Sequence, residues 1–303
     1  MAPPAQAPPQ IFDRARLAAR RDRIAKTFAD YSFLRQRVLA DLESRLDDTP
    51  RKFARGLELG AAGGELSARL LASGKTQAMV AADTAPAFLA AAQARGLDAA
   101  FADEEALPFP PASFDLIAAP LTLHWVNDLP GALAQIKRTL QPDGLFVGAL
   151  FGGGTLAELR SVLTDAETEI MGGLAPRLSP LPGLRDMAGL LQRAGFALPV
   201  ADRDTVTVRY ADPLRLLADL KGMGERANFT RGNAQPLPRR VLARAMALYR
   251  ERFAGPDGRV PATFEIVHIL GWAPAPGQPQ PLKPGSARAS LADAVRRVHK
   301  DEG

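Results

Sequence analysis

The sequence predicts an α/β protein whose mostly parallel sheet is covered by helices on both faces. Short apolar runs alternate with amphipathic helical segments between residues 56 and 151, a pattern typical of parallel strands joined by crossover helices. A glycine-rich turn joins the first apolar run to the first of these helices. No apolar run is long enough to span a bilayer, so we expect a soluble protein.

The region before the first strand is expected to be helical. Residues 1–10, MAPPAQAPPQ, are rich in proline and alanine and are predicted to be disordered. Residues 11–51 carry apolar side chains at helical spacing, among them Phe28, Leu34 and Val38. These N-terminal helices should pack against, or cover, the elements that follow.

Seven strands and the helices between them are expected in the rest of the chain. The predicted strands are residues 56–60, 78–83, 98–103, 114–123, 144–151, 204–210 and 261–272. The predicted helices are residues 65–74, 85–96, 129–140, 152–173, 183–196, 213–229 and 238–253. One domain would then cover residues 52–273, with a helical insert at about 213–258 and a Pro-rich, loosely ordered tail at 274–303.

Composition excludes several kinds of chemistry and bears on the partners. The 303 residues contain no cysteine, which excludes disulfides, thiolate catalysis and cysteine-ligated metal centres. The net charge is +5, but acidic residues are nearly as numerous as basic ones. The densest basic run, RARLAARRDR at residues 14–23, is interpreted as a solvated helix face, with an acidic partner or RNA as the alternative. Nucleic acid is therefore not the expected partner.

The N-terminal region does not read as a targeting signal. Asp13, Asp22 and Asp30 interrupt the arginine-rich run, and the apolar segment of a secretory signal is missing. Together with the absence of cysteine and the frequent use of alanine, arginine and proline, this predicts a bacterial cytoplasmic protein.

The turn LELGAAGG, residues 57–64, is a candidate ligand-binding element. Ligands of open α/β sheets bind beyond the carboxyl ends of the strands, and three glycines here would let backbone N–H groups approach a ligand. The spacing GAAGGE does not fit the G-x-G-x-x-G turn of dinucleotide sites. Glu58, inside the strand, suits a ligand with a cationic amino-acid group, which favours S-adenosyl-L-methionine over NAD.

Carboxylates at the ends of the next two strands extend this candidate site. Asp83 lies about twenty residues beyond the turn, where a carboxylate accepts hydrogen bonds from ribose hydroxyls; the alternative is a helix N-cap. Asp103 follows the third strand, where it would accept from an adenine amino group; the alternative is a turn residue. The predicted cofactor-binding residues are Glu58, Gly60, Ala62, Gly64, Asp83, Thr84, Asp103 and Glu104.

Ordered motifs along the chain resemble those of a known superfamily. LELGAAGG, ADEEALPF and FDLIAAPLTLHWVNDLPGAL are similar to the motifs of class I S-adenosylmethionine-dependent methyltransferases. IFDR, LFGGGTLAELR and DLKGMGE resemble, more specifically, the respiratory complex I assembly factor five family, over residues 11–291. The segment LHWVNDLP also occurs in the related malonyl–acyl carrier protein methyltransferases.

The resemblance implies a Rossmann-like class I methyltransferase fold with S-adenosyl-L-methionine as cofactor. Mitochondrial members of the assembly-factor family are described as hydroxylating an arginine of a complex I subunit, so the implied partner is a protein. A malonyl–acyl carrier protein or small-molecule methyltransferase and a non-catalytic assembly chaperone are the alternatives. The family has a Cys-Gly pair where this chain has Ala61 and Ala62. If position 62 needs a positive φ, its methyl group costs on the order of 1 kcal/mol, and we expect cofactor binding to survive.

The residues after the fourth strand are the candidates for the acceptor side. The predicted catalytic residues are His124, Trp125 and Asp128. His124 would act as a base or orient the acceptor; the alternative is that it only packs beside Trp125. His124 and Asp128 are four residues apart, so they would share one face if the segment is helical. No metal site is predicted, because a second histidine ligand is not evident.

Overall fold

Seven strands form one sheet in the order β3-β2-β1-β4-β5-β7-β6. The computed structural model describes residues 9–231 and 235–279. The strands are β1 (Phe53–Leu59), β2 (Thr76–Asp83), β3 (Asp98–Phe101), β4 (Phe114–Pro120), β5 (Leu140–Phe151), β6 (Ala197–Tyr210) and β7 (Val260–Trp272). Strands β1 to β5 pair in parallel, whereas β7 runs antiparallel between β5 and β6. The predicted fold class, a mostly parallel seven-stranded sheet, is confirmed.

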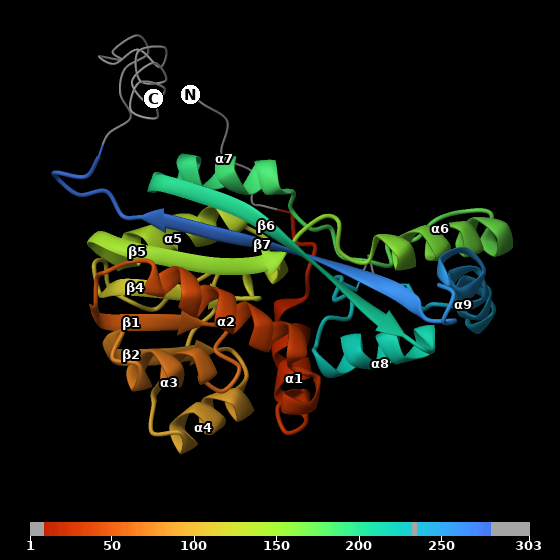
Figure 1. Ribbon diagram of the computed structural model, residues 1–303, viewed down its shortest axis with the longest axis horizontal. Helices are drawn as coiled ribbons and strands as arrows, with labels where there is room; N and C mark the ends of the chain where they lie inside the picture. Colours follow the sequence, from red (N-terminus) through yellow and green to blue (C-terminus); the bar gives the residue numbers. More distant parts are fainter. Residues whose placement is uncertain (1–8, 232–234, 280–303) are drawn as a thin grey trace, which may run out of the picture.

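Helices cover both faces of the sheet, as the sequence predicted (Figure 1). Adjacent residues of β4 point to opposite faces: Leu116 belongs to one apolar core and Ile117 to the other. The covering helices are α2 (Phe33–Asp47) and α3 (Glu65–Ala72) over the first core, and α5 (Leu129–Thr139) and α7 (Leu184–Ala194) over the second. A further helix, α4 (Pro86–Ala94), follows β2.

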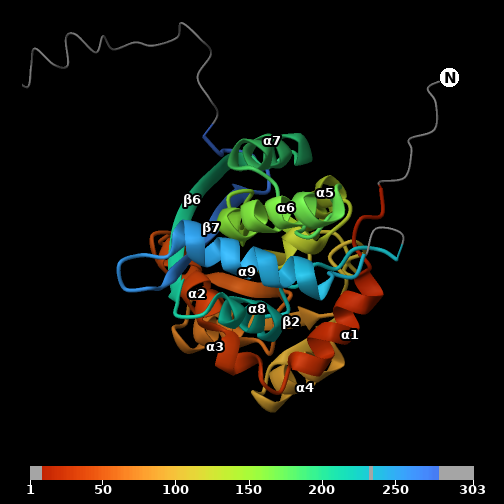
Figure 2. The same cartoon turned by 90° about the vertical axis from the view of Figure 1, so that its right-hand side faces the viewer.

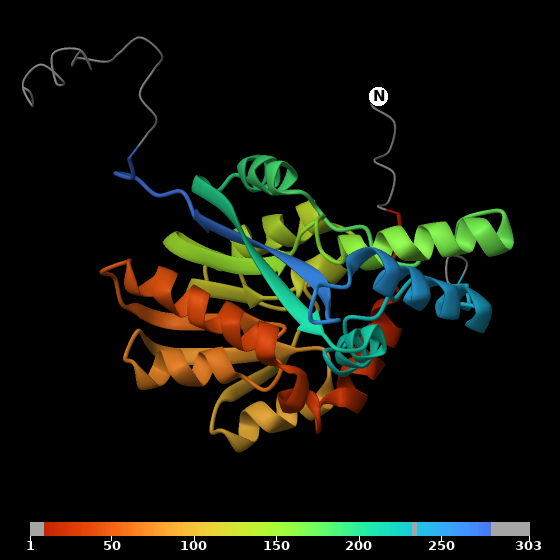
Figure 3. The ribbon, with the colours of Figure 1, turned by 45° about the vertical axis from the view of Figure 1, so that its right-hand side comes forward.

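Three helices gather beside the antiparallel end of the sheet. They are α6 (Ala157–Met171), α8 (Pro213–Gly222) and α9 (Arg239–Phe253). Figure 2 shows α9 between the other two, and Figure 3 shows α6 and α9 projecting together from the sheet. The helix expected over 213–229 ends at Gly222, because Gly224 adopts a φ of +82° and the chain then runs extended to Phe229.

The first helix, α1 (Arg14–Ile24), lies across the carboxyl ends of the strands (Figure 1). Asp13 caps it by accepting a hydrogen bond from the backbone N–H of Arg16 at 2.9 Å. Just before the cap, Phe12 forms a β-bridge with Phe229 and an edge-to-face contact with Trp125 at 5.3 Å. The segment that precedes the sheet is thereby anchored over the carboxyl ends of the strands.

Two short 3₁₀ turns complete the fold, η1 (Phe28–Tyr31) and η2 (Leu123–Trp125). Within residues 9–231 and 235–279, no helix combines the length and the apolar character needed to cross a membrane. Most of the predicted disordered N-terminus, 1–10, and of the predicted loose tail, 274–303, lies outside the described residues. The assignment of residues 52–273 to one domain stays a prediction.

Candidate cofactor and acceptor site

The first turn has the backbone conformation that glycine favours. Gly60 and Gly64 have φ values of +60° and +74°. A Cβ at position 60 would lie 2.5 Å from Thr122, and one at position 64 would lie 2.4 Å from Leu97. Both glycines are therefore already required by packing within the chain. Their role in admitting a ligand stays a prediction.

Ala62 also has a positive φ, +48°. This is the condition under which its methyl group strains the turn. The backbone N–H of Ala62 donates to Asp83 Oδ2 at 3.0 Å. The turn and the end of β2 are thus joined by a hydrogen bond that fixes this conformation.

Glu58 lies fully buried under the turn and is held by partners from two helices. Its Oε1 accepts from Arg35 of α2 at 3.0 Å, and its Oε2 accepts from the N–H and hydroxyl of Ser67 at 2.9 and 2.7 Å. Burial raises the pKa of the Glu58 carboxyl above its usual value, against the opposing effect of Arg35 and Ser67. Arg35 also donates to the carbonyls of Ala61 and Pro120, so it ties the ends of β1 and β4 together.

Asp83 is at the end of β2, as predicted, with its side chain 1% exposed. It accepts hydrogen bonds from Arg21 of α1 at 2.8 Å and from the backbone N–H groups of Ala62 and Ala85, each at 3.0 Å. Burial opposes ionisation, yet Arg21 and these N–H groups hold the pKa of Asp83 below its usual value. The N-cap of α4 is Ala85, so Asp83 is not the helix N-cap that the alternative reading expected.

Asp103 and Glu104 share one arginine of α1. Arg14 donates to Asp103 Oδ1 at 2.7 Å and also contacts Glu104, which is bonded in turn to the Thr122 hydroxyl. Asp103 accepts from the N–H of Glu105 at 2.9 Å, the geometry of a turn residue. Thr84, the remaining predicted contact, is half-buried between β2 and α4.

Sequence reasoning missed these arginines. Arg14 and Arg21 belong to the basic run interpreted as a solvated helix face, but their side chains are only 13% and 10% exposed. For these two residues that interpretation is wrong: their guanidinium groups are internal counter-charges of buried carboxylates. The available signal was their spacing of seven residues, which places both on one face of a helix together with buried Leu17.

The carboxylates fit a ligand that presents hydroxyl and amino groups at this edge of the sheet. Asp83 is ionised and offers acceptor oxygens, and Asp103, 31% exposed, is accessible. A ligand hydroxyl that is to reach Asp83 must replace Arg21 or share the carboxylate with it, because the side chain is otherwise covered. These carboxylates are therefore suitable acceptors for ligand hydroxyl and amino groups, provided that Arg21 moves aside or shares Asp83 with the ligand.

His124 is paired with a residue that the sequence did not suggest. In η2, its Nε2 lies 3.0 Å from Glu225 Oε2, and its Nδ1 has no hydrogen-bond partner among the described residues. The imidazole, with a side chain only 1% exposed, contacts the ring of Phe151 edge-on at 5.1 Å. Asp128 instead caps α5 by accepting from the N–H of Gly131 at 2.9 Å. The expected shared helical face of His124 and Asp128 does not form, because the chain turns between η2 and α5.

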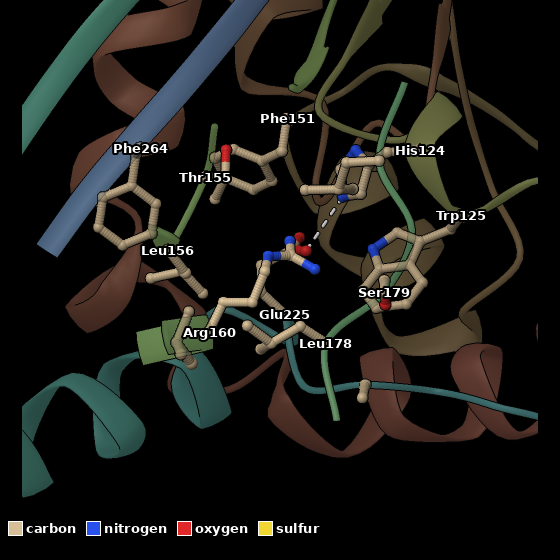
Figure 4. Close-up of a pocket in the computed structure, with 13 residues that line it drawn as sticks. His124, Trp125, Phe151, Thr155, Leu156, Arg160, Leu178, Ser179, Glu225 and Phe264 are labelled. Atoms are coloured by element: carbon tan, nitrogen blue, oxygen red, sulfur yellow. Dashed lines mark hydrogen bonds and ion pairs between the residues drawn. The ribbon is translucent and has the colours of Figure 1, made fainter. Parts of the chain in front are cut away.

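A small cavity of about 40 Å³ borders this pair (Figure 4). Trp125 and Phe151 supply aromatic walls, and the side chain of Arg160 is directed into the space. Across the described parts of the chain, 9–231 and 235–279, no three His, Asp or Glu side chains are grouped as a metal ion would require. The cavity therefore offers a hydrogen-bonded acid–imidazole pair rather than a set of metal ligands.

The comparisons with known proteins agree with this architecture. Residues 57–148 match the methyltransferase domain family. The YcgJ protein of Bacillus subtilis has a similar fold, with a TM-score of 0.55 at 17% identity, covering 79% of this chain and 99% of that one. This structural similarity supports the fold alone.

Two relatives are similar in sequence over most of their length. The mitochondrial arginine-hydroxylase NDUFAF5 of Danio rerio is 38% identical over 287 residues, which cover 93% of this chain and 89% of the relative. The malonyl-[acyl-carrier protein] O-methyltransferase of Halorhodospira halophila is 34% identical over 278 residues, covering 89% and 91%.

The similarity to mitochondrial proteins corrects the predicted location. A bacterial cytoplasmic protein was expected from composition, but the zebrafish relative is named as mitochondrial, as are other relatives of that name. A lack of cysteine suits any reducing compartment, so composition did not have the power to distinguish them. Identity and coverage together show that the chain belongs to the NDUFAF5 arginine-hydroxylase family, within the class I S-adenosylmethionine-dependent methyltransferase superfamily, and is an enzyme related to malonyl–acyl carrier protein methyltransferases.

Proposed function

We propose that the chain binds S-adenosyl-L-methionine at the first turn, with Asp83 facing the ribose hydroxyls and Asp103 and Glu104 facing the adenine. The support is the position of these acceptors at the ends of adjacent parallel strands, where ligands of this fold class bind. The lowered pKa of Asp83 keeps it ionised as a hydrogen-bond acceptor near neutral pH. When bound, the cofactor supplies a sulfonium centre with an electrophilic methyl group.

We further propose that the enzyme modifies an arginine side chain of a protein, a subunit of respiratory complex I. The observation that carries this proposal is the Glu225 carboxylate in the cavity beside Trp125 and Phe151. Carboxylates bind guanidinium groups through charge-assisted hydrogen bonds, and aromatic faces stack on them. The presence of the Arg160 side chain in the same cavity supports its ability to admit a guanidinium group (Figure 4).

The residues of the cavity have separate roles in this proposal. Glu225 binds the substrate guanidinium, and His124 orients Glu225 through the 3.0 Å contact. The Nδ1 of His124 is free to take a proton from, or donate one to, the acceptor group. Burial of the Trp125 and Phe151 rings excludes water. In the hydroxylation, a C–H bond of the arginine becomes C–O–H: dioxygen is the oxidant, one of its oxygen atoms enters the product, and a two-electron reductant with two protons converts the other to water. Dioxygen and the reductant both come from outside the chain.

Mass spectrometry of the client tests this function. Purified chain, labelled S-adenosyl-L-methionine and the complex I subunit are incubated in air with a two-electron reductant, and the client arginine is expected to gain one oxygen atom. Glu225→Gln should abolish this gain, whereas Glu251→Gln, an exposed change on α9, should leave it intact. Gain of a labelled methyl group would instead support the methyltransferase function suggested by the Halorhodospira relative. A stable, unmodified complex would indicate an assembly chaperone.

A further inference from the structure

A wide groove opens from the His124 cavity between α1, α6 and the end of α8. Its volume is about 600 Å³, and an adjoining hollow on the α1 side measures about 410 Å³. Arg16, Arg20, Lys221 and Arg226 line both hollows, and Arg23 lines the second. We call the two hollows together the basic groove. Leu178, Leu220, Glu225 and Ala227 line both the groove and the His124 cavity, so the two spaces adjoin.

Four cations of the basic groove, Arg20, Arg23, Lys221 and Arg226, have no carboxylate partner among the described residues. Arg16 lies 3.9 Å from Asp13, and Arg177, which also lines the groove, is paired with Glu167. Arg20 donates only to the backbone carbonyls of Arg226 and Ala227, and Arg23 donates only to that of Ala19. The side chains of Lys221 and Arg226 form no hydrogen bond or ion pair with any described residue. By contrast, Arg14 and Arg21 of α1 and Arg35 of α2 each contact a carboxylate.

Like charges are held close together at this position. Burial lowers the pKa of the Arg20 guanidinium below its usual value, and the positive charges of Arg226, Arg16 and Arg23 lower it further. Among the described residues, Glu225 is the one carboxylate that lines the groove, and it is engaged by His124. A concentration of uncompensated positive charge in a concave surface attracts an anionic ligand.

The opposite wall of the groove is apolar. It is formed mainly by leucines of α6, α8 and α9. Leu159 and Leu163 are 2% and 6% exposed, Leu217 and Leu242 are partly buried, and Leu237 at the edge is 36% exposed. Leu174, 66% exposed, borders a neighbouring hollow at the projecting end of α6. Apolar side chains exposed next to a charged surface are typical of sites that bind other proteins.

We propose that the basic groove binds an acidic, leucine-rich segment of the protein that this enzyme modifies. Carboxylates of that segment would pair with Arg20, Arg23, Lys221 and Arg226, and its apolar side chains would pack on the leucine wall. Because Glu225 lines both the groove and the His124 cavity, a neighbouring residue of the same segment would lie within reach of it. This inference rests on the proposed function in taking a protein as the substrate.

The lining favours a polypeptide over nucleic acid. Binding of single-stranded RNA or DNA generally depends on aromatic side chains that stack with bases. The aromatic residue lining the groove is Phe229, which is 6% exposed and stacked against Phe12. The groove therefore provides positive charge and leucine side chains without an open aromatic face.

Fluorescence anisotropy with a labelled peptide that alternates glutamate with leucine tests the proposal on the full chain. The peptide should bind, and replacing its glutamates by glutamine, or its leucines by serine, should weaken binding. Lys221→Glu with Arg226→Glu should weaken binding by roughly tenfold or more, since both are exposed residues at the entrance. The matched control is Arg215→Glu, an exposed residue on α8 outside the groove, which should leave the affinity unchanged within about twofold.

Three results would overturn the proposal that the groove binds an acidic segment. They are no peptide binding by the parent chain, an equal loss of peptide affinity in the double variant and the Arg215→Glu control, and tighter binding of polyuridine than of the peptide. Failure of the proposed function looks different. If the chain binds the peptide through Lys221 and Arg226 but leaves the client arginine unmodified, the groove proposal stands and the proposed arginine modification is refuted. Thermal shift with S-adenosyl-L-methionine in the same variants verifies that the cofactor site is intact.

Discussion

Ala62 places a side chain where the backbone favours glycine. With its φ at +48°, we expect Ala62→Gly to raise the free energy of unfolding by about 1 kcal/mol, because the strain of the left-handed conformation is relieved. For a chain of this size the melting temperature should rise by roughly 2–4 °C. Differential scanning calorimetry measures this directly.

The matched control for this change is the neighbouring alanine. Ala61 is 1% exposed and packs in a small cluster with Ala81, Ala92 and Leu97, and it is not among the residues with positive φ. Ala61→Gly removes a packed methyl group and adds freedom to the unfolded chain, so it should destabilise the protein. A stabilising effect at both positions would contradict the strain assigned to Ala62.

Asp83 should make stability sensitive to acid. Its pKa is lower in the folded chain than in the unfolded one, so its stabilising contribution is complete above the unfolded value of about 4 and is lost as the pH falls through the folded value. Asp83→Asn should therefore destabilise the chain strongly at neutral pH, and the gap to the parent should close in acid. Urea unfolding at a series of pH values measures this gap. A constant gap would refute the assignment, and Asp30→Asn, at an exposed position, is the control.

At this scale the sequence identified acceptors but not their partners. Glu58, Asp83 and Asp103 occupy the strand ends that spacing predicted. Arg21 is 62 residues from Asp83, and Glu225 is 101 residues from His124, so no local pattern connects them. Such pairs arise only from the way α1 and the segment after α8 cross the sheet edge.

Helix α2 is joined to the sheet by a buried ion pair that can be tested as a unit. Arg35→Met leaves the Glu58 carboxyl fully buried without its counter-charge, which should cost about 3–5 kcal/mol of unfolding free energy. Glu58→Met should be comparably harmful, because it leaves Arg35 without its carboxylate. The double variant should be less destabilised than the sum of the two single changes, since no unpaired charge remains.

Urea denaturation of the parent, both single variants and the double variant completes this cycle. Strict additivity would show that the Arg35–Glu58 contact contributes no coupling. Arg37→Met serves as the surface reference, because its contact with Asp204 involves side chains 51% and 35% exposed and should change stability by less than about 1 kcal/mol.

The elements themselves were largely predictable, whereas some of their ends were not. Apolar alternation located all seven strands, but β6 begins at Ala197 rather than at the predicted residue 204. Its first seven residues, ALPVADR, include a proline and a single β-branched residue, so they lack the alternating β-branched residues that predict a strand over 204–210. Pairing with β7 across the whole length of β6 forms this segment, and such pairing is a tertiary effect.

For the molecule as a whole, the N-terminal helices form part of the core rather than an appendage. Five apolar side chains of α2 are at most 2% exposed: Leu34, Val38, Leu39, Leu42 and Leu46. At about 1.5–3 kcal/mol each, their burial is comparable to the whole stability of a typical domain. The fragment 52–303 would also leave Glu58 and Asp83 without their arginines.

We therefore expect the fragment 52–303 not to fold, although residues 52–273 carry the complete sheet. Near-ultraviolet circular dichroism and thermal denaturation should show no cooperative transition for this fragment. The parent chain and a fragment spanning residues 9–279 should both unfold cooperatively. A cooperative transition in the fragment 52–303 would establish the predicted domain boundary at residue 52.

The fold class was accessible from the sequence because it depends on short-range periodicity, and seven strands alternating with helices allow few topologies. The subcellular location could not be predicted, because amino-acid composition reflects the redox chemistry of a compartment and does not identify which compartment it is. The relatives supplied that information, and they contradicted the expectation of a bacterial cytoplasm.

Helix α1 has two arginine faces with different tasks. Arg14 and Arg21 neutralise carboxylates at the sheet edge, while Arg16, Arg20 and Arg23 line the basic groove. Because α1 contributes to both sites, a displacement of the helix on binding at one site also changes the other site. Nucleoside and client should therefore influence each other's affinity, and thermodynamic reciprocity requires the two effects to be equal in size.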